Sequence, residues 1–263
     1  MNYNTSAFIE ISLYALAKLT KNKYKVIICD NDSRYIDKKK LKRIVSKYRN
    51  VELFFRKQSA PGSMGHGEAL NILIDKIDTP YGVILDADAT FLKKGWDEIL
   101  INQLDDKVEI IGAPIVKNPI KPTDFPLTYA VLFDTEVFKA LKIDMRPKNL
   151  KIGQDVGWEM REKYLHNGYA GKILEVRNTR EYKDGPFRNV ICAECYLEGF
   201  DIFASHFGRG ASLGVPKYKE WNRLLRVPIL NIVAYVCMKI KGYRERKEWL
   251  AICKKIIDKE AEI

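Results

Sequence analysis

Apolar positions recur with helical spacing in some segments of the chain and form short runs in others. Residues 5–19 carry Ile9, Leu13 and Leu16 three or four positions apart, and Thr5 or Ser6 can cap this helix. The pattern predicts further helices over residues 38–48 and 68–77, near Gly95, and over residues 154–166, with a loop of small residues over 59–67. It predicts strands over residues 25–29, 51–55, 81–85, 108–116, 128–133, 171–176 and 200–204. Three strand–helix repeats within the first ~90 residues are typical of an α/β fold with a parallel sheet.

The pattern changes beyond Pro216. Two basic helices are predicted there, over residues 217–239 and 244–259, and Trp221, Leu225, Ile232 and Val236 lie at roughly helical spacing. The chain is therefore expected to hold one α/β unit followed by a basic helical extension over residues 217–263.

Positive charge is concentrated in two segments. The 263 residues carry a formal net charge of +11, from 45 basic and 34 acidic side chains. Residues 34–57 hold ten basic and two acidic side chains, and residues 217–263 hold twelve and six, so the remainder is slightly acidic. Either segment could face a phosphate-rich partner, or could be the solvated face of a helix.

Cysteine usage and hydropathy indicate where the protein works. Five cysteines, including a lone C-x-x-C at Cys192 and Cys195, do not make a disulfide framework or a four-ligand zinc site. Structural thiols and a reducing, cytoplasmic setting are expected. Glu10 interrupts the first apolar stretch, so no signal peptide is predicted. The longest uncharged apolar run near the other end has 12 residues, 227–238, short of the ~20 that span a membrane.

Acidic side chains follow two of the predicted strands. Asp30 and Asp32 come after the first, and Asp86 and Asp88 come directly after residues 81–85. Ligands of parallel sheets bind beyond the carboxyl ends of the strands, and alternation in an extended chain points Asp86 and Asp88 the same way. Two carboxylates there suit a divalent cation that also binds phosphates. The alternative is an acidic turn that caps the helix near Gly95.

Six segments, in order, carry a family resemblance. They are residues 2–5 (N-Y-N-T), 26–33 (V-I-I-C-D-N-D-S), 65–71 (G-H-G-E-A-L-N), 85–88 (L-D-A-D), 152–161 (I-G-Q-D-V-G-W-E-M-R) and 205–212, which begins S-H-F-G. Over residues 2–212 the chain resembles a family-2 glycosyltransferase with the GT-A fold. The resemblance implies a Rossmann-like, mostly parallel central sheet, with a nucleotide-sugar-binding half over 1–115 and an acceptor-binding half over 116–216.

The chain departs from the family pattern at two places. It begins where the first strand of the family ends, so that strand is expected to be missing or reduced to a stub. A truncated or misread start would explain this, as would a neighbouring chain that supplies the strand. Gln154 stands where the family usually has a glutamate, which leaves Asp155 as the only carboxylate of that pair.

The resemblance implies an inverting transfer from a nucleotide diphosphate sugar to an acceptor hydroxyl. Asp155 would be the general base, and Mn²⁺ or Mg²⁺ would be held by Asp88 and His206, with Asp86 at the metal or the ribose. The donor would also be contacted by Tyr3, Asp30, Asp32, Arg56, Lys57 and Arg209. His206 and Asp155 have structural alternatives, as a core histidine and a helix-dipole partner.

The expected partners follow from the same resemblance. The acceptor is expected to be a glycan or a lipid-linked glycan, and the basic tail could contact an anionic membrane peripherally, from the cytoplasmic side. The tail could instead pack on the domain or form a homo-oligomer contact. Two other functions compete: a sugar-phosphate nucleotidyltransferase, and a non-enzymatic nucleic-acid-binding module. The second lacks aromatic stacking and helix-turn-helix or zinc-finger spacing, so no nucleic acid is expected.

Overall fold

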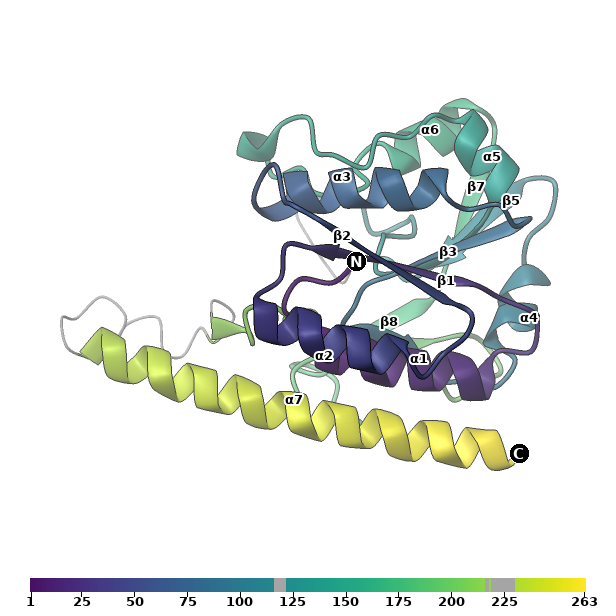
Figure 1. Ribbon diagram of the computed structural model, residues 1–263. Helices are drawn as coiled ribbons and strands as arrows, with labels where there is room; N and C mark the ends of the chain where they lie inside the picture. The colour runs from purple at the N-terminus through teal and green to yellow at the C-terminus, as the bar shows by residue number, and fades with distance from the viewer. Residues whose placement is uncertain (116–121, 216–217, 219–229) are drawn as a thin grey trace.

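The chain folds into an α/β domain with one long helix packed along its side (Figure 1). The computed structural model describes residues 1–115, 122–215, 218 and 230–263. The helices are α1 (Ser6–Leu19), α2 (Tyr35–Val45), α3 (Gly62–Asp75), α4 (Trp96–Ile101), α5 (Thr135–Ala140), α6 (Met160–His166) and α7 (Leu230–Glu262), with a 3₁₀ turn at Leu150–Ile152. The strands are β1 (Val26–Asn31), β2 (Val51–Arg56), β3 (Tyr81–Leu85), β4 (Ala89–Phe91), β5 (Val108–Gly112), β6 (Ala130–Asp134), β7 (Ala170–Ile173), β8 (Glu175–Asn178), β9 (Ala193–Tyr196) and β10 (Ile202–His206).

The strands form three separate sheets. Strands β1 and β2 pair in parallel, and a second sheet has the order β3-β6-β5-β7, in which β6 runs antiparallel to both neighbours and β5 and β7 are parallel. The third sheet, β4-β10-β9-β8, is antiparallel. The predicted α/β architecture is therefore confirmed, but the sheets are mixed where a mostly parallel sheet was expected.

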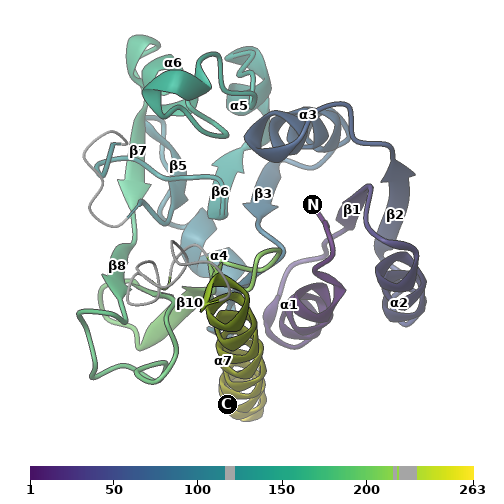
Figure 2. The same cartoon turned by 90° about the vertical axis from the view of Figure 1, so that its left-hand side faces the viewer.

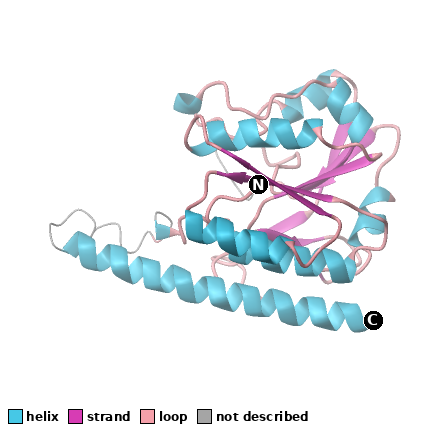
Figure 3. Cartoon of the chain, in the orientation of Figure 1, coloured by secondary structure: helices cyan, strands magenta, loops and turns pink. Residues whose placement is uncertain are grey.

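Helices cover the strands from two sides. Figure 2 shows α3, α5 and α6 on one side of β1–β3 and β5–β7, with α1, α2 and α7 on the other. Figure 3 shows the same layers by type of structure. The main core joins α1, α4, α7 and the antiparallel sheet around Phe8, Phe91, Phe203 and Trp249, all almost fully buried. This core fixes β10, which carries His206, against β4.

The predicted helical tail is one continuous helix over its described part, α7, where two helices were expected. Gly242 lies inside it because the helix packs closely on the loop before it: a Cβ at Gly242 would be 2.0 Å from the carbonyl oxygen of Leu213. The half of α7 near the C-terminus buries Trp249, Cys253 and Ile257. Of the predicted stretch of residues 217–229 the structure describes only Tyr218, so Trp221 and Leu225 lie outside the described residues.

Glycines explain two other differences from the expected helices. Helix α3 begins at Gly62 rather than at residue 68, because Gly65 and Gly67 serve close packing: a Cβ at Gly67 would be 2.6 Å from the carbonyl oxygen of Met145. Helix α6 begins at Met160 rather than at residue 154, since Gly153 and Gly157 have φ of 81° and 71°, which breaks the helix.

The remaining strand boundaries differ less. The expected strand over residues 171–176 is two strands, β7 and β8, which belong to different sheets. Strand β5 ends at Gly112, and residue 116, at the expected end, lies outside the described residues. The short elements α5, β4 and β9 were not predicted. No described helix is both long and apolar enough to cross a membrane.

Candidate active site

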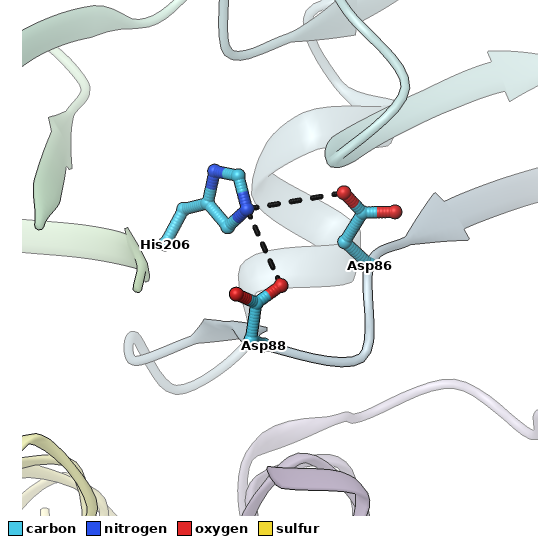
Figure 4. Close-up of side chains that lie close together, drawn as sticks. All are labelled: Asp86, Asp88 and His206. Carbon is cyan, nitrogen blue, oxygen red and sulfur yellow. Dashed lines mark ion pairs between the residues drawn. The ribbon is translucent and has the colours of Figure 1, made fainter. Parts of the chain in front are cut away.

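Two carboxylates and an imidazole converge beyond the carboxyl end of β3. Asp86 and Asp88 follow β3 in the turn that leads to β4, and His206 is the last residue of β10 (Figure 4). The Nε2 atom of His206 lies 3.4 Å from Oδ1 of Asp88 and 3.8 Å from Oδ2 of Asp86. The pairing of β10 with β4, with His206 opposite Ala89, brings these distant segments together.

Backbone hydrogen bonds fix Asp88. Its Oδ2 accepts from the N–H groups of Arg209 (2.8 Å) and Gly210 (2.7 Å), and its own carbonyl accepts from Phe207. Burial alone raises the pKa of Asp88, but the facing His206 and these two N–H groups outweigh it and hold the pKa well below its usual value. Asp88 is therefore an ionised carboxylate with one oxygen anchored and the other turned toward His206.

The ring of Tyr129 orients His206. The two rings stack with centroids 4.3 Å apart and an interplanar angle of 18°. Tyr129 is fixed in turn, because its hydroxyl donates to the carbonyl of Pro114 at 2.5 Å and its own carbonyl accepts from the N–H of Asp86. Tyr129 thus links His206 to Asp86, and no sequence pattern marked it.

These three side chains fit a divalent cation. Their ligand atoms all lie within 4.8 Å of one another. Metal–ligand bonds of ~2.0–2.2 Å allow two ligands of one ion to stand up to ~4.2 Å apart, which covers both distances from His206. Two carboxylates and one imidazole are a donor set for a divalent cation that takes both oxygen and nitrogen ligands.

A pocket of about 360 Å³ opens beside this cluster. Asp86, His206 and Asp155 all line it, although they come from three distant parts of the chain. Asp155 lies in the turn before α6, not in its first helical turn, and its Oδ1 accepts from Ser63 Oγ at 2.6 Å. Asp155 therefore faces the same space as the candidate metal ligands, while the next carboxylate along the chain, Glu159, is buried and ion-paired with Lys148.

His66 is a member of the site that the sequence did not reveal. It lies on α3 and lines the pocket, with Nε2 3.6 Å from Oδ1 of Asp86. Burial lowers the pKa of His66, partly offset by Asp86, so the ring is neutral at pH 7. Its buried Nε2 makes no hydrogen bond to the described residues. A neutral imidazole with a free nitrogen beside Asp86 adds a further potential ligand or hydrogen-bond partner to the site.

Arg209 lines the pocket, but its guanidinium is turned to the protein. It pairs with Glu245 of α7, donates to the hydroxyl of Tyr218 and the carbonyl of Ile191, and lies 4.2 Å from the ring centroid of Phe207. The contact with Asp88 is made by the Arg209 backbone. The predicted contact of this arginine with the donor stays a prediction.

The other predicted donor residues form a second group, at the carboxyl ends of β1 and β2. Asp30 is fully buried, and it accepts from Asn2 Nδ2 (2.8 Å) and from the N–H of Ser33. Asp32 follows with φ of 70° and pairs with Lys38 at 3.4 Å. Tyr3, which follows Asn2 in the sequence, is exposed. None of these residues lines the 360 Å³ pocket.

Arg56 connects this group to the start of α3. Its guanidinium donates to the carbonyl of Gly65 and pairs with Glu68 at 2.8 Å, and Asn31 donates to the same carbonyl. The next residue, Lys57, is exposed. Gly65 directly precedes His66, which lines the pocket. The residues at the carboxyl ends of β1 and β2 are therefore linked to the pocket through a single peptide unit.

The buried cysteines do not form a second site. All five are free, and only Cys237 is not buried. The thiol of Cys192 accepts from Ser205 Oγ at 3.8 Å, and burial raises its pKa to about 12. Such thiols behave as packing groups, in agreement with the predicted structural role.

Two solved structures of other proteins superpose on this chain. A mannosyltransferase from Pyrobaculum calidifontis, PcManGT, solved with GDP-Man and Mn²⁺, superposes with a TM-score of 0.51 at 17% identity over 65% of this chain. The match covers 52% of PcManGT, about half of its length. TarS (1–349) of S. aureus superposes with a TM-score of 0.50 at 14% identity, over 92% of this chain and 69% of that one. No curated protein sequence matches the chain.

The sequence itself matches a family model. The model of glycosyl transferase family 2 covers residues 1–168, well over half of the chain, and includes the Asp86–Asp88 turn, His66 and Asp155. Both similar structures agree with the α/β architecture that the resemblance implied. The chain therefore belongs to glycosyl transferase family 2.

Proposed function

We propose that this glycosyltransferase moves a sugar from a nucleotide diphosphate sugar to an acceptor hydroxyl, with inversion at the anomeric carbon. One observation carries the proposal: Asp155 lines the same pocket as Asp86 and His206, two of the three residues of the candidate metal cluster. A carboxylate and a candidate metal site that share a pocket can act on the same transfer reaction. The carboxylate can act on the attacking hydroxyl and the metal on the departing diphosphate.

In this proposal Asp155 removes the proton from the acceptor hydroxyl as its oxygen attacks the anomeric carbon. The hydroxyl of Ser63 and the N–H of Val156 both donate to Oδ1 of Asp155, which fixes the position of the carboxylate beside the pocket. A base placed in this way contributes typically ~10²–10⁴-fold to the rate. The nucleoside diphosphate departs on the opposite face, so no covalent sugar–enzyme intermediate is needed.

Asp88 and His206 would hold Mn²⁺ or Mg²⁺, with Asp86 as a further ligand or a partner of the ribose. The ion supplies positive charge that stabilises the departing diphosphate. PcManGT was solved with GDP-Man and Mn²⁺, which favours this donor class and this ion. Asp30 and Asp32 would contact the base, with Tyr3, Arg56 and Lys57 around the nucleotide, and Arg209 would position Asp88.

Two observations bear on the acceptor side. Trp158 and Arg180 line the pocket along with Asp155, so this half offers an aromatic face and a cation to a glycan.

We propose residues 1–115 as the donor half, 116–216 as the acceptor half and 217–263 as the extension. A lipid-linked glycan would be reached from the cytoplasmic side, with α7 in peripheral contact with an anionic membrane or with a second copy of the chain.

The competing functions lose their support. The family match supports a glycosyltransferase over a nucleotidyltransferase or a nucleic-acid-binding module. Five of the ten basic residues over 34–57 lie on α2, where Leu41, Ile44 and Val45 are buried and the lysines 38–40 and 42 are not. That arrangement is an ordinary amphipathic surface helix.

A donor-hydrolysis assay tests the proposal. The protein is incubated with a panel of UDP-, GDP- and dTDP-sugars, with Mn²⁺, with Mg²⁺ or with EDTA, and release of the nucleoside diphosphate is measured. We expect release from one donor or a few, and only with a divalent ion. Release of pyrophosphate from a sugar phosphate and a nucleoside triphosphate, or release that EDTA leaves unchanged, would contradict the proposal.

A further inference from the structure

The two carboxylates of the candidate metal cluster are held in different ways. Oδ2 of Asp88 accepts two backbone N–H groups. Among the described residues, no backbone N–H donates to the carboxylate of Asp86. One imidazole lies beside each of its oxygens instead: Nε2 of His206 is 3.8 Å from Oδ2, and Nε2 of His66 is 3.6 Å from Oδ1. Asp86 is therefore the carboxylate of the cluster whose orientation the backbone does not fix.

His66 lies beside the cluster without belonging to it. The ligand atoms of Asp86, Asp88 and His206 are all within 4.8 Å of one another, and His66 is not among the described residues that meet this limit. Two ligands of one ion stand at most ~4.2 Å apart, so His66 is placed outside the coordination shell. Figure 4 shows one oxygen of Asp86 joined to His206 and the other directed away from it. His66 approaches that second oxygen.

The Nε2 atom of His66 is buried and lacks a partner. The His66 side chain is 23% exposed, but Nε2 itself is buried and makes no hydrogen bond within the described part of the chain. A buried polar atom is costly to leave unsatisfied. A carboxylate only accepts, so Asp86 favours the tautomer of His66 that carries its proton on Nε2. The distance of 3.6 Å is ~0.4 Å beyond the longest ordinary N–H···O bond, and a small turn of the carboxylate closes it.

The backbone of His66 is fixed independently of Asp86. The carbonyl of the preceding residue, Gly65, accepts from Arg56 and from Asn31, at the ends of β2 and β1. On the other side, Gly67 packs so closely that a Cβ there would be 2.6 Å from a backbone carbonyl oxygen. The start of α3 is thus held on both sides of His66, and the imidazole can serve as a fixed point for a carboxylate that turns.

We propose that His66 is a positioning residue of the metal site, whose Nε2–H donates to Oδ1 of Asp86 when the site holds its cation. The inference rests on the metal site of the proposed function. The bond keeps Oδ2 of Asp86 on the side of His206, as two backbone N–H groups already fix Asp88. Groups that hydrogen-bond a metal ligand typically contribute ~10–100-fold to metal affinity. His66 makes no bond to the ion itself.

Mn²⁺ binding by two matched variants tests the proposal. His66→Gln keeps an N–H donor near the place of Nε2, and His66→Met has a similar length without a donor. Free Mn²⁺ is measured by electron paramagnetic resonance during titration, with Mn²⁺ alone and with UDP, GDP or dTDP. We expect Mn²⁺ affinity to fall by ~10–100-fold in His66→Met and to stay within a few-fold in His66→Gln. The control is His166→Gln, at an exposed position of α6, which should bind Mn²⁺ as the unsubstituted chain does.

The spectrum of bound Mn²⁺ separates a positioning residue from a ligand. Pulsed measurements count the imidazole nitrogens that coordinate the ion directly, and we expect one, from His206. His66→Met should keep that nitrogen signal. Circular dichroism and Tm establish that each variant is folded, and His66→Ala replaces His66→Met as the variant without a donor if the latter does not fold.

Three results would overturn the role of His66 and leave the metal site standing. They are unchanged Mn²⁺ affinity in His66→Met, an equal loss in His66→Gln and His66→Met, and two coordinated imidazole nitrogens in the unsubstituted chain. A different result would overturn the metal site of the proposed function and this inference with it: an unsubstituted chain that binds no Mn²⁺, either alone or with any of the three nucleotides.

Discussion

Arg209 and Glu245 form a buried ion pair that joins the loop after β10 to α7, and their side chains are 1% and 9% exposed. The backbone N–H of the same arginine holds Asp88. Helix α7 therefore does more than lie along the domain, because it fixes the residue whose main chain positions a candidate metal ligand. This contact could not be predicted, since the pair lies 36 residues apart in sequence.

Removal of Glu245 should destabilise the fold. Glu245→Gln leaves the Arg209 guanidinium buried without its counter-charge, and loss of one partner of a buried pair typically costs ~3–5 kcal/mol in the free energy of unfolding. Urea unfolding followed by circular dichroism measures it. The control is Glu248→Gln, an exposed position on the same helix, for which we expect a change within ~0.5 kcal/mol. Equal stability of the two variants would show that the pair contributes nothing.

Asp88→Asn should abolish metal-dependent donor binding and keep the fold. The amide oxygen can still accept the two N–H bonds, while the charge that faces His206 is lost. Calorimetric titration with a nucleoside diphosphate and Mn²⁺ should show affinity lowered by more than the ~10–100-fold typical of residues one step removed from a metal. Asp105→Asn is the matched control, since Asp105 also accepts two backbone N–H bonds, at an exposed turn. Unchanged affinity at Asp88 would remove it from the site.

Asp155→Asn should reduce turnover without loss of the donor. If Asp155 is the general base, kcat falls by ~10²–10⁴-fold while the donor Kd changes little. Transfer to the acceptor and donor binding are measured side by side. The control is Glu162→Gln, at an exposed position of α6. Transfer that persists within a few-fold would place the base elsewhere. Glu159 is a poor substitute, because its carboxylate is held by Lys148 and by the N–H of Asp144.

The sequence predicted the three residues of the candidate metal cluster but not the residues that support them. Asp86, Asp88 and His206 were found because each belongs to a motif with its own order along the chain. Tyr129 and His66 have no such motif, and their roles arise only when β6 and α3 pack beside β3. Contacts of this kind depend on three-dimensional packing, and the spacing of residues along the chain does not indicate them.

The predicted element boundaries were wrong where a glycine allows close packing inside a helix instead of forming a turn. Gly65, Gly67 and Gly242 lie inside helices because another chain segment approaches too closely for a Cβ. The same residue type ends the expected helix at Gly157, through a left-handed φ. Sequence alone cannot distinguish these two uses of glycine, since both follow from the missing side chain.

The cysteines give a prediction that depends on pH. Burial raises the pKa of Cys192 to about 12, so its thiolate fraction at pH 8 is only about 10⁻⁴, and the pKa of Cys195 and Cys253 is raised as well. A thiol-reactive chromogenic disulfide at pH 8 should modify one cysteine of the native chain, Cys237, and all five after denaturation. Rapid native modification of Cys192 would show that the antiparallel sheet opens, and that this thiol is not simply a packing group.

The last prediction concerns the N-terminal half of α7. Near its start the helix exposes a set of large apolar side chains that the C-terminal half does not: Leu230, Ile232, Val233, Tyr235, Val236, Ile240 and Tyr243. Basic residues follow within the same stretch, at Lys239, Lys241, Arg244, Arg246 and Lys247, while Arg223 and Arg226 lie outside the described residues. An apolar face flanked by basic side chains can lie in an anionic membrane surface, although a contact between two copies would also cover it.

Cosedimentation with vesicles separates these alternatives. We expect binding to anionic but not to neutral vesicles at ~0.1 M salt, where the Debye length is ~10 Å, and release near 1 M, where it is ~3 Å. Ile232→Ser with Val236→Ser should weaken binding without affecting Tm, because both positions are exposed, and Ile263→Ser at the far end of the chain is the control. If the double variant instead turns a dimer into a monomer and neither chain prefers anionic vesicles, the exposed face of α7 is an interface between copies and not a membrane surface.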